Sequence, residues 1–130
     1  MSPRDCRKHL CGKSDENWDA GEILRQQNKI NAAANRYYYA MFHAAWVWAD
    51  KNSHLRIKDG TYRGFHDSLI NIVSTHAGSR AKDFRNSLNN MFGFRVTADY
   101  EVDSVDKADL ESELTTANGV RQELMRDWDK

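Results

Sequence analysis

Residues 30–51 of this 130-residue chain read INAAANRYYYAMFHAAWVWADK, and this stretch decides the fold. It contains no proline, and its apolar side chains recur at the spacing of an α-helix. They cover almost the whole circumference of that helix: Ala34, Tyr37, Tyr38, Met41, Phe42, Ala45, Trp46 and Trp48. A helix that is apolar all round is buried among other elements. The stretch therefore predicts the central helix of a bundle.

The rest of the chain also favours helices, because its only proline is Pro3 and apolar residues recur every three or four positions. The predicted helices cover residues 14–27, 30–51, 61–77, 79–94 and 104–128, with Ser14, Ser79 and Ser104 as N-caps. Residues 52–60 are expected to form a connecting loop, and residues 95–103 an acid-rich loop. We expect an N-terminal tail at 1–13 and a single domain at 14–130. The predicted fold is all-α, an up-and-down antiparallel bundle of about five helices.

The net charge is zero, since 19 Lys and Arg balance 19 Asp and Glu, but the charges are unevenly distributed. Residues 25–95 carry 11 basic and 4 acidic residues, a local +7, whereas residues 99–113 carry 7 acids and one lysine, a local −6. A basic groove in the first segment would bind phosphate weakly and in a salt-sensitive way. No stretch is long and apolar enough to span a bilayer, and the N-terminus lacks the apolar core of a signal peptide. We expect a cytoplasmic protein without a membrane partner.

Two cysteines lie in the polar N-terminal segment and are expected to be free thiols. Cys6, His9 and Cys11 could supply three zinc ligands, but a structural site needs four and no fourth is near in sequence. The chain also lacks a glycine-rich phosphate loop and the usual catalytic metal motifs. We therefore expect no metal and no cofactor.

Two groups of polar residues are candidates for a site, and each has a structural alternative. Arg36, Tyr39 and His43 share one stripe of the central helix, either as a buried polar network or as the lining of a groove. Arg95 precedes Asp99 and Tyr100, so its guanidinium could either bind a phosphate or form a local ion pair with Asp99. Spacing alone leaves both choices open.

Both groups lie in segments that resemble a known family. Residues 33–45, AANRYYYAMFHAA, and residues 95–101, RVTADYE, resemble two motifs of the HEPN domain family, in its branch of small bacterial and archaeal proteins. The resemblance extends over about residues 14–128. It implies a helical bundle that usually forms a homodimer, with the polar motifs paired across a groove. It also implies a setting beside a nucleotidyltransferase, in toxin–antitoxin or defence pairs.

Many HEPN proteins are metal-independent ribonucleases whose motif is an Arg followed four to six residues later by a His. Arg95 matches that Arg and would hold the phosphate, but Tyr100 stands where the His is expected. His43 is a second candidate for proton transfer. In the basic segment before the third helix, Tyr62 stands where a His is common, next to Arg63.

We therefore expect a nucleotide- or RNA-binding module without efficient catalysis, which binds through Arg95, Asp99, Tyr100, Arg36 and Arg63. One alternative is an active ribonuclease or toxin that uses Arg95 with Tyr100 or His43. The other is a structural bundle that binds a protein partner.

Overall fold

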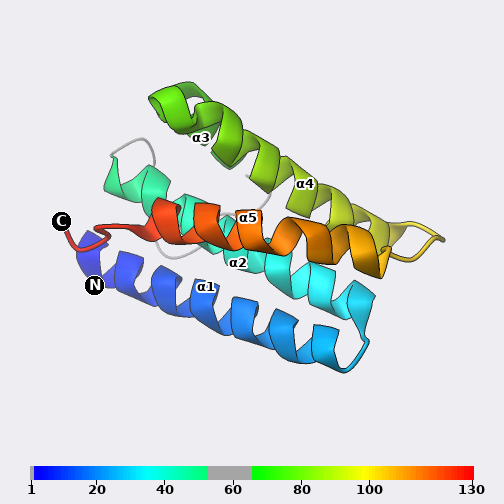
Figure 1. Ribbon diagram of the computed structural model, residues 1–130. Helices are drawn as coiled ribbons and strands as arrows, with labels where there is room; N and C mark the ends of the chain where they lie inside the picture. The colour runs from blue at the N-terminus through cyan, green and yellow to red at the C-terminus, as the bar shows by residue number, and fades with distance from the viewer. Residues whose placement is uncertain (1, 53–65) are drawn as a thin grey trace.

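The central helix of the computed structural model is α2, and it contacts each of the other four α-helices. The structure describes residues 2–52 and 66–130. Within them, α1 (Pro3–Gln26), α2 (Ile30–Lys51), α4 (Ala81–Tyr100) and α5 (Lys107–Met125) alternate in direction, and both termini lie at the same end (Figure 1). The short α3 (His66–His76) and the 3₁₀ turn η1 (Gly78–Arg80) precede α4. The prediction of an all-α bundle is confirmed, and α2 has the predicted bounds.

Small side chains on α2 let its neighbours approach closely. Six alanines of this helix are fully buried, namely Ala33, Ala34, Ala40, Ala44, Ala45 and Ala49. Larger side chains from the surrounding helices fill the space against them, among them Leu69, Val73, Met91, Leu110 and Leu124. The core therefore follows the axis of α2, as its all-round apolar pattern predicts. No helix of the described residues is both long and apolar enough to cross a membrane.

The prediction of a tail at residues 1–13 is wrong, because α1 already begins at Pro3. Ser2 and Asp5 form a reciprocal capping box: the Ser2 hydroxyl accepts from the Asp5 amide at 3.1 Å, and the Asp5 carboxylate accepts from the Ser2 amide at 3.3 Å. Ser14, expected to be the N-cap, is fully buried inside the helix and donates to the Ala40 carbonyl oxygen at 2.7 Å. Leu10 is also buried, so the first half of α1 packs on the bundle.

Other predicted boundaries also shift. The acid-rich loop does not begin at residue 95, because α4 continues to Tyr100. The Asp106 side chain caps α5 by accepting from the Asp109 amide, in place of the Ser104 cap. Gly78 has a φ of +60°, which suits the predicted end of the third helix. The next helix, α4, does not begin at the predicted Ser79 cap, because η1 precedes it and α4 starts at Ala81. The predicted start of the third helix, near residue 61, lies outside the described residues.

Candidate functional site

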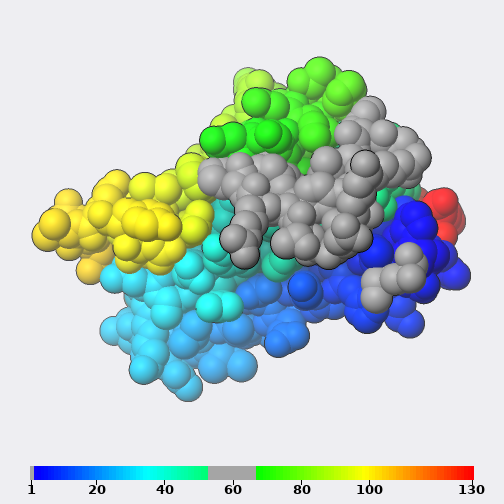
Figure 2. All heavy atoms as spheres, turned by 180° about the vertical axis from the view of Figure 1, so that it is seen from behind, coloured from blue at the N-terminus to red at the C-terminus, as the bar shows by residue number. Residues whose placement is uncertain are grey.

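The candidate site lies where the last turns of α4 pack beside the first half of α2. The end of α4 and the residues after it project beside α2 (yellow beside cyan in Figure 2). Arg95 extends from α4 toward α2, and its side chain is only 15% exposed. Its guanidinium carbon lies 5.2 Å from the ring centre of Tyr38, 5.4 Å from that of Tyr39 and 5.7 Å from that of Tyr100. Three aromatic rings therefore surround one cation.

Asp99 lies one helical turn after Arg95 and holds one edge of the guanidinium. The Arg95 Nε is 3.3 Å from the Asp99 Oδ2, and the same oxygen accepts a hydrogen bond from the Asn35 amide at 2.9 Å. Arg95 Nη2 donates to the Tyr100 hydroxyl over a long 3.5 Å. Nη1 donates no hydrogen bond to any of the described residues. The site thus contains the predicted local ion pair of Arg95 with Asp99.

The tyrosines of the site differ in their exposure. Tyr38 is 3% exposed, and its burial raises its pKa against the opposing influence of the Arg95 charge. Tyr39 is half-buried, whereas Tyr100 is 73% exposed. The exposed Tyr100 ring beside a held guanidinium is an arrangement on which a planar base can stack while its phosphate meets the cation.

His43 lies further along α2 and is linked to this cluster by the rings of Tyr39 and Phe42. Its ring centre is 6.4 Å from that of Tyr39 and 5.7 Å from that of Phe42. Burial, followed by the positive charge of Lys13, lowers the pKa of His43 to about 4, and the Tyr39 backbone opposes this weakly. Its Nδ1 atom makes no hydrogen bond of normal geometry in the described part of the chain. The imidazole is therefore neutral at pH 7 and a weak base.

The predicted binding residues are only partly brought together. Arg95, Asp99 and Tyr100 share the end of α4 and meet. Arg36 is exposed, and its guanidinium contacts the Asn17 side-chain oxygen on α1 at 3.4 Å, away from Arg95. Arg63 and its neighbour Tyr62 lie outside the described residues.

Sequence reasoning missed Asn35 and Tyr38 as parts of the site. Tyr38 looked like an ordinary core residue because it belongs to the apolar pattern of α2. Asn35 belongs to the same motif but carried no signal of its own, since its partner Asp99 is 64 residues away in the chain. The only signal in the sequence was that Asn35 and Tyr38 belong to the motif at residues 33–45. Their contacts with Asp99 and Arg95 become visible only when α2 packs on α4.

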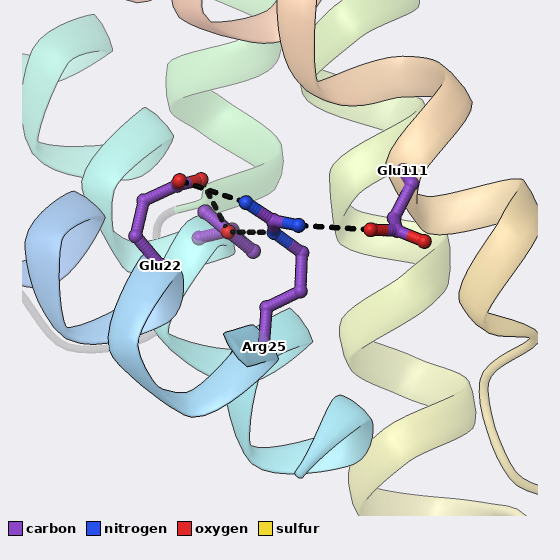
Figure 3. A network of polar contacts seen from close by, with 4 residues as sticks. Glu22, Arg25 and Glu111 are labelled. Atoms are coloured by element: carbon purple, nitrogen blue, oxygen red, sulfur yellow. Dashed lines mark hydrogen bonds and ion pairs between the residues drawn. The ribbon is translucent and has the colours of Figure 1, made fainter. Parts of the chain in front are cut away.

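A second polar cluster joins α1, α2 and α5, and its groups are already paired (Figure 3). Arg25 donates to Glu22 at 2.9 Å and to Glu111 at 2.8 Å. The buried Tyr37 hydroxyl donates to Glu22 at 2.6 Å and accepts from Arg25 at 3.1 Å. Burial would raise the pKa of Glu22, but the hydrogen bonds from Tyr37 and Arg25 outweigh it and lower that pKa. This closed network ties three helices together and is structural.

The described residues hold no group of three His, Cys, Asp or Glu side chains placed to bind a metal ion. Cys6, His9 and Cys11 all lie on α1, and the two cysteines are free thiols, as predicted. Burial, with a smaller effect of the Asp15 charge, raises the pKa of Cys11 to about 11. That thiol is therefore protonated at pH 7 and unreactive.

Comparison with known proteins found no family model, no curated protein and no solved structure that matches this chain significantly.

Proposed function

We propose that this chain is a HEPN-like module that binds a nucleotide or single-stranded RNA at Arg95 without efficient catalysis. The observation that carries the proposal is the Arg95 guanidinium, which Asp99 and the rings of Tyr38 and Tyr39 position beside the exposed ring of Tyr100. A positioned guanidinium loses little freedom when it binds a phosphate oxygen. Stacking of a base on an exposed aromatic ring contributes about 1–3 kcal/mol.

We expect catalysis to be inefficient because the groups near Arg95 are poorly suited to proton transfer. Tyr100 places a hydroxyl 3.5 Å from Arg95 Nη2, whereas the group that most often acts as a general base in enzymes is a histidine. The ring centre of Tyr39 lies 6.4 Å from that of His43 and 5.4 Å from the guanidinium carbon of Arg95. The His43 pKa of about 4 makes this imidazole a weak proton acceptor. Binding therefore fits this site better than the alternative of an efficient metal-independent ribonuclease.

The resemblance also supplies the biological setting that we propose. It is a cytoplasmic toxin–antitoxin or defence pair in which this module, as a homodimer, works beside a nucleotidyltransferase. Because Asp99 already neutralises part of the Arg95 charge, we expect weak affinity that falls as salt rises.

A binding measurement tests the proposal directly. Fluorescence anisotropy of a labelled single-stranded RNA, in EDTA and at low salt, should show saturable binding that Arg95→Gln weakens at least tenfold. Tyr100→Leu should weaken it by about five- to tenfold, whereas Tyr100→Phe keeps the ring and should bind almost as wild type does. Arg85→Gln is the matched control, since Arg85 is an exposed arginine of the same helix.

Two outcomes would overturn the proposal, and one would replace it. The proposal fails if the wild type does not bind the RNA, or if the wild type and Arg95→Gln bind it equally well. The Arg95–Asp99 pair would then be a structural contact in a helical bundle that binds a protein partner. Cleavage of the RNA in EDTA that disappears in Arg95→Gln would show a ribonuclease. Circular dichroism of each variant separates lost binding from lost folding.

A further inference from the structure

Two connected grooves follow the boundary between α4 and α5, which pack side by side (Figure 1). Their volumes are about 380 and 520 Å³, and Asn90 and Glu113 line both, so we call them together the α4–α5 groove. Its described lining residues include four acids and one cation, namely Asp83, Asp109, Glu113, Glu123 and Arg80. The groove therefore has a net charge of −3, although the chain as a whole is neutral.

Arg80 neutralises the acids at only one end of the groove. It donates to the two carboxylate oxygens of Glu123 at 2.7 and 2.9 Å, and it also pairs with Asp83. Glu113 and Asp109 lie further along the groove, and neither forms an ion pair with another described residue. An acid at position 109 suits the first turn of α5, where the helix dipole favours negative charge, but this reason does not apply to the half-buried Glu113.

A buried hydroxyl in the same groove also lacks a partner. Ser87 is only 3% exposed, yet it lines the groove on α4. Its hydroxyl makes no hydrogen bond with any of the described residues, whereas the buried Ser14 hydroxyl donates to the Ala40 carbonyl oxygen at 2.7 Å. A buried hydroxyl without a partner destabilises a fold. A ligand with N–H donors in the groove would supply that partner.

The acids are spread along the groove, and this distribution narrows the choice of ligand. A bound metal ion needs ligands that converge on one point, and the described residues hold no such group of three His, Cys, Asp or Glu side chains. The negative charge of the groove repels phosphate. Asp109 and Glu113 are four residues apart on α5, so their backbones are separated by about 6 Å along the helix. Two amines joined by four methylene groups have a similar separation.

The other lining residues suit the remaining parts of such a chain. Side-chain oxygens of Asn86, Asn90 and Thr116 can accept hydrogen bonds from protonated amines. Phe94 and Val120 offer apolar surface to the methylene groups between the amines. Alkyl amines, like the lysine side chain, are protonated at pH 7.

We infer that the α4–α5 groove binds a linear aliphatic polyamine, with ammonium groups at Glu113 and Asp109 and an N–H group donated to the Ser87 hydroxyl. This site is independent of the proposed RNA binding, because Arg95 is not among the residues that line the groove. Its carboxylates are at most half-buried, so the attraction is partly screened by solvent. The dissociation constant should be about 1 mM at low salt and should rise with salt.

NMR titration of the ¹⁵N-labelled chain with spermidine, without RNA and in EDTA at low salt, tests this site. Amide signals of residues 86–94 and 109–123 should shift in a saturable way. Hexaamminecobalt(III) has the same charge of +3 as spermidine but is compact, so it should bind at least fivefold more weakly. This comparison separates recognition of a linear chain from general attraction of a trivalent cation.

Three variants test the contacts. Glu113→Gln keeps an oxygen for the Asn90 amide but removes the charge, and it should weaken spermidine binding about fivefold. The matched control is Glu16→Gln, an exposed acid of α1, which should change the affinity less than twofold. Ser87→Ala should weaken binding about threefold while the urea midpoint stays equal or rises, since alanine has no hydroxyl to leave unpaired and is the better helix former.

Four results would each overturn the inference. The first is a wild type without saturable shifts up to about 20 mM spermidine, and the second is equal binding of hexaamminecobalt(III). The third is a Glu113→Gln variant that binds as tightly as Glu16→Gln, because the cation would then lie elsewhere. The fourth is a folded Ser87→Ala variant with unchanged affinity, since the groove would then hold no contact beyond its acids.

Discussion

At the scale of single residues, the same helix can place neighbouring polar side chains in different environments. Asn35 and Arg36 are consecutive on α2, yet Asn35 reaches Asp99 on α4 while Arg36 reaches Asn17 on α1. The 100° between consecutive helical residues is enough to separate them. The predicted stripe of Arg36, Tyr39 and His43 therefore does not act as one group: of the three, Tyr39 contacts Arg95, Arg36 is exposed and His43 is half-buried.

His43 should make the stability of the fold depend on pH. Its pKa falls from 6.5 in an ordinary setting to about 4 in the folded chain, so the unfolded chain binds the proton more tightly. The free energy of unfolding should therefore be highest above pH 6.5 and fall as the pH drops toward 4, by about 3 kcal/mol over that window.

The test compares urea denaturation of the wild type and His43→Gln at pH 7.0 and 4.5. Both proteins keep the three carboxylates with lowered pKa values, Asp5, Glu22 and Glu123, so the effects of these groups cancel. The variant should lose less stability between the two pH values than the wild type. Equal losses would show that the folded chain does not hold the imidazole neutral.

At the scale of elements, the close contact of α1 and α2 depends on one glycine. A Cβ atom at Gly21 would lie 2.8 Å from Cδ1 and 2.9 Å from Cε1 of Tyr37. That ring cannot move aside easily, because it is fully buried, packs edge-on against Trp18 and is hydrogen-bonded through its hydroxyl to Glu22. Gly21→Ala should therefore destabilise the fold by about 1–3 kcal/mol.

Gly12→Ala on the same helix is the matched control for this prediction. The space around Gly12 is open, so alanine there should stabilise the fold by about 0.5–1 kcal/mol through its better helix propensity. Urea midpoints, measured with unchanged slopes, give both values. If both substitutions stabilised the fold, or both destabilised it, the ring of Tyr37 would not be what limits the approach of the two helices.

The elements that sequence reasoning located best are those with a strong hydrophobic period. The bounds of α2 are predicted to the residue because apolar side chains occupy it from end to end. The first half of α1 was missed because Leu10 is its only large aliphatic residue, and Ser14 followed by two acids has the pattern of an N-cap. The end of α4 was missed because residues 95–103 are rich in acids and were predicted to be a loop, whereas the contacts of Arg95 and Asn35 with Asp99 hold the last turns in place.

The sequence allowed us to predict which residues of α4 form the candidate site, but not which residues of other helices contact them. Arg95, Asp99 and Tyr100 lie close in the sequence, so their pairing could be proposed from spacing. Their contacts with Asn35 and Tyr38 depend on the packing of α4 against α2, which no local pattern specifies. The same applies to Arg36, whose direction depends on the position of α1.

At the scale of the whole molecule, basic residues of the segment 25–95 form ion pairs with acidic residues that lie later in the chain. Arg25 of the basic segment pairs with Glu111 of the acidic one, and Arg80 pairs with Glu123 on α5. Arg95 pairs with Asp99 within α4. The local excess of +7 is therefore partly neutralised in the fold, and the field available to a phosphate near Arg95 is modest. Weak, salt-sensitive binding is the expected consequence.

Residues near the N-terminus also form contacts between helices, and their deletion should cause the largest loss of stability that we predict. Arg7 pairs with Asp50, which is 1% exposed, at 2.9 Å and also donates to the Trp128 carbonyl oxygen at 2.7 Å. It thus connects the start of α1, the end of α2 and the C-terminal residues. Deletion of residues 1–13 removes this arginine together with the buried Leu10.

Loss of one partner of a buried ion pair costs about 3–5 kcal/mol, and loss of a buried leucine about 2–5 kcal/mol. Because a domain of this size is stable by about 5–15 kcal/mol, the shortened chain should lose most of its cooperative thermal unfolding, as followed by circular dichroism. Lys8→Ala, an exposed change within the same segment, should leave the transition within a few degrees of wild type. A deletion variant that melts like the wild type would mean that residues 1–13 behave as a tail after all, and that the Arg7 contacts contribute nothing to the fold.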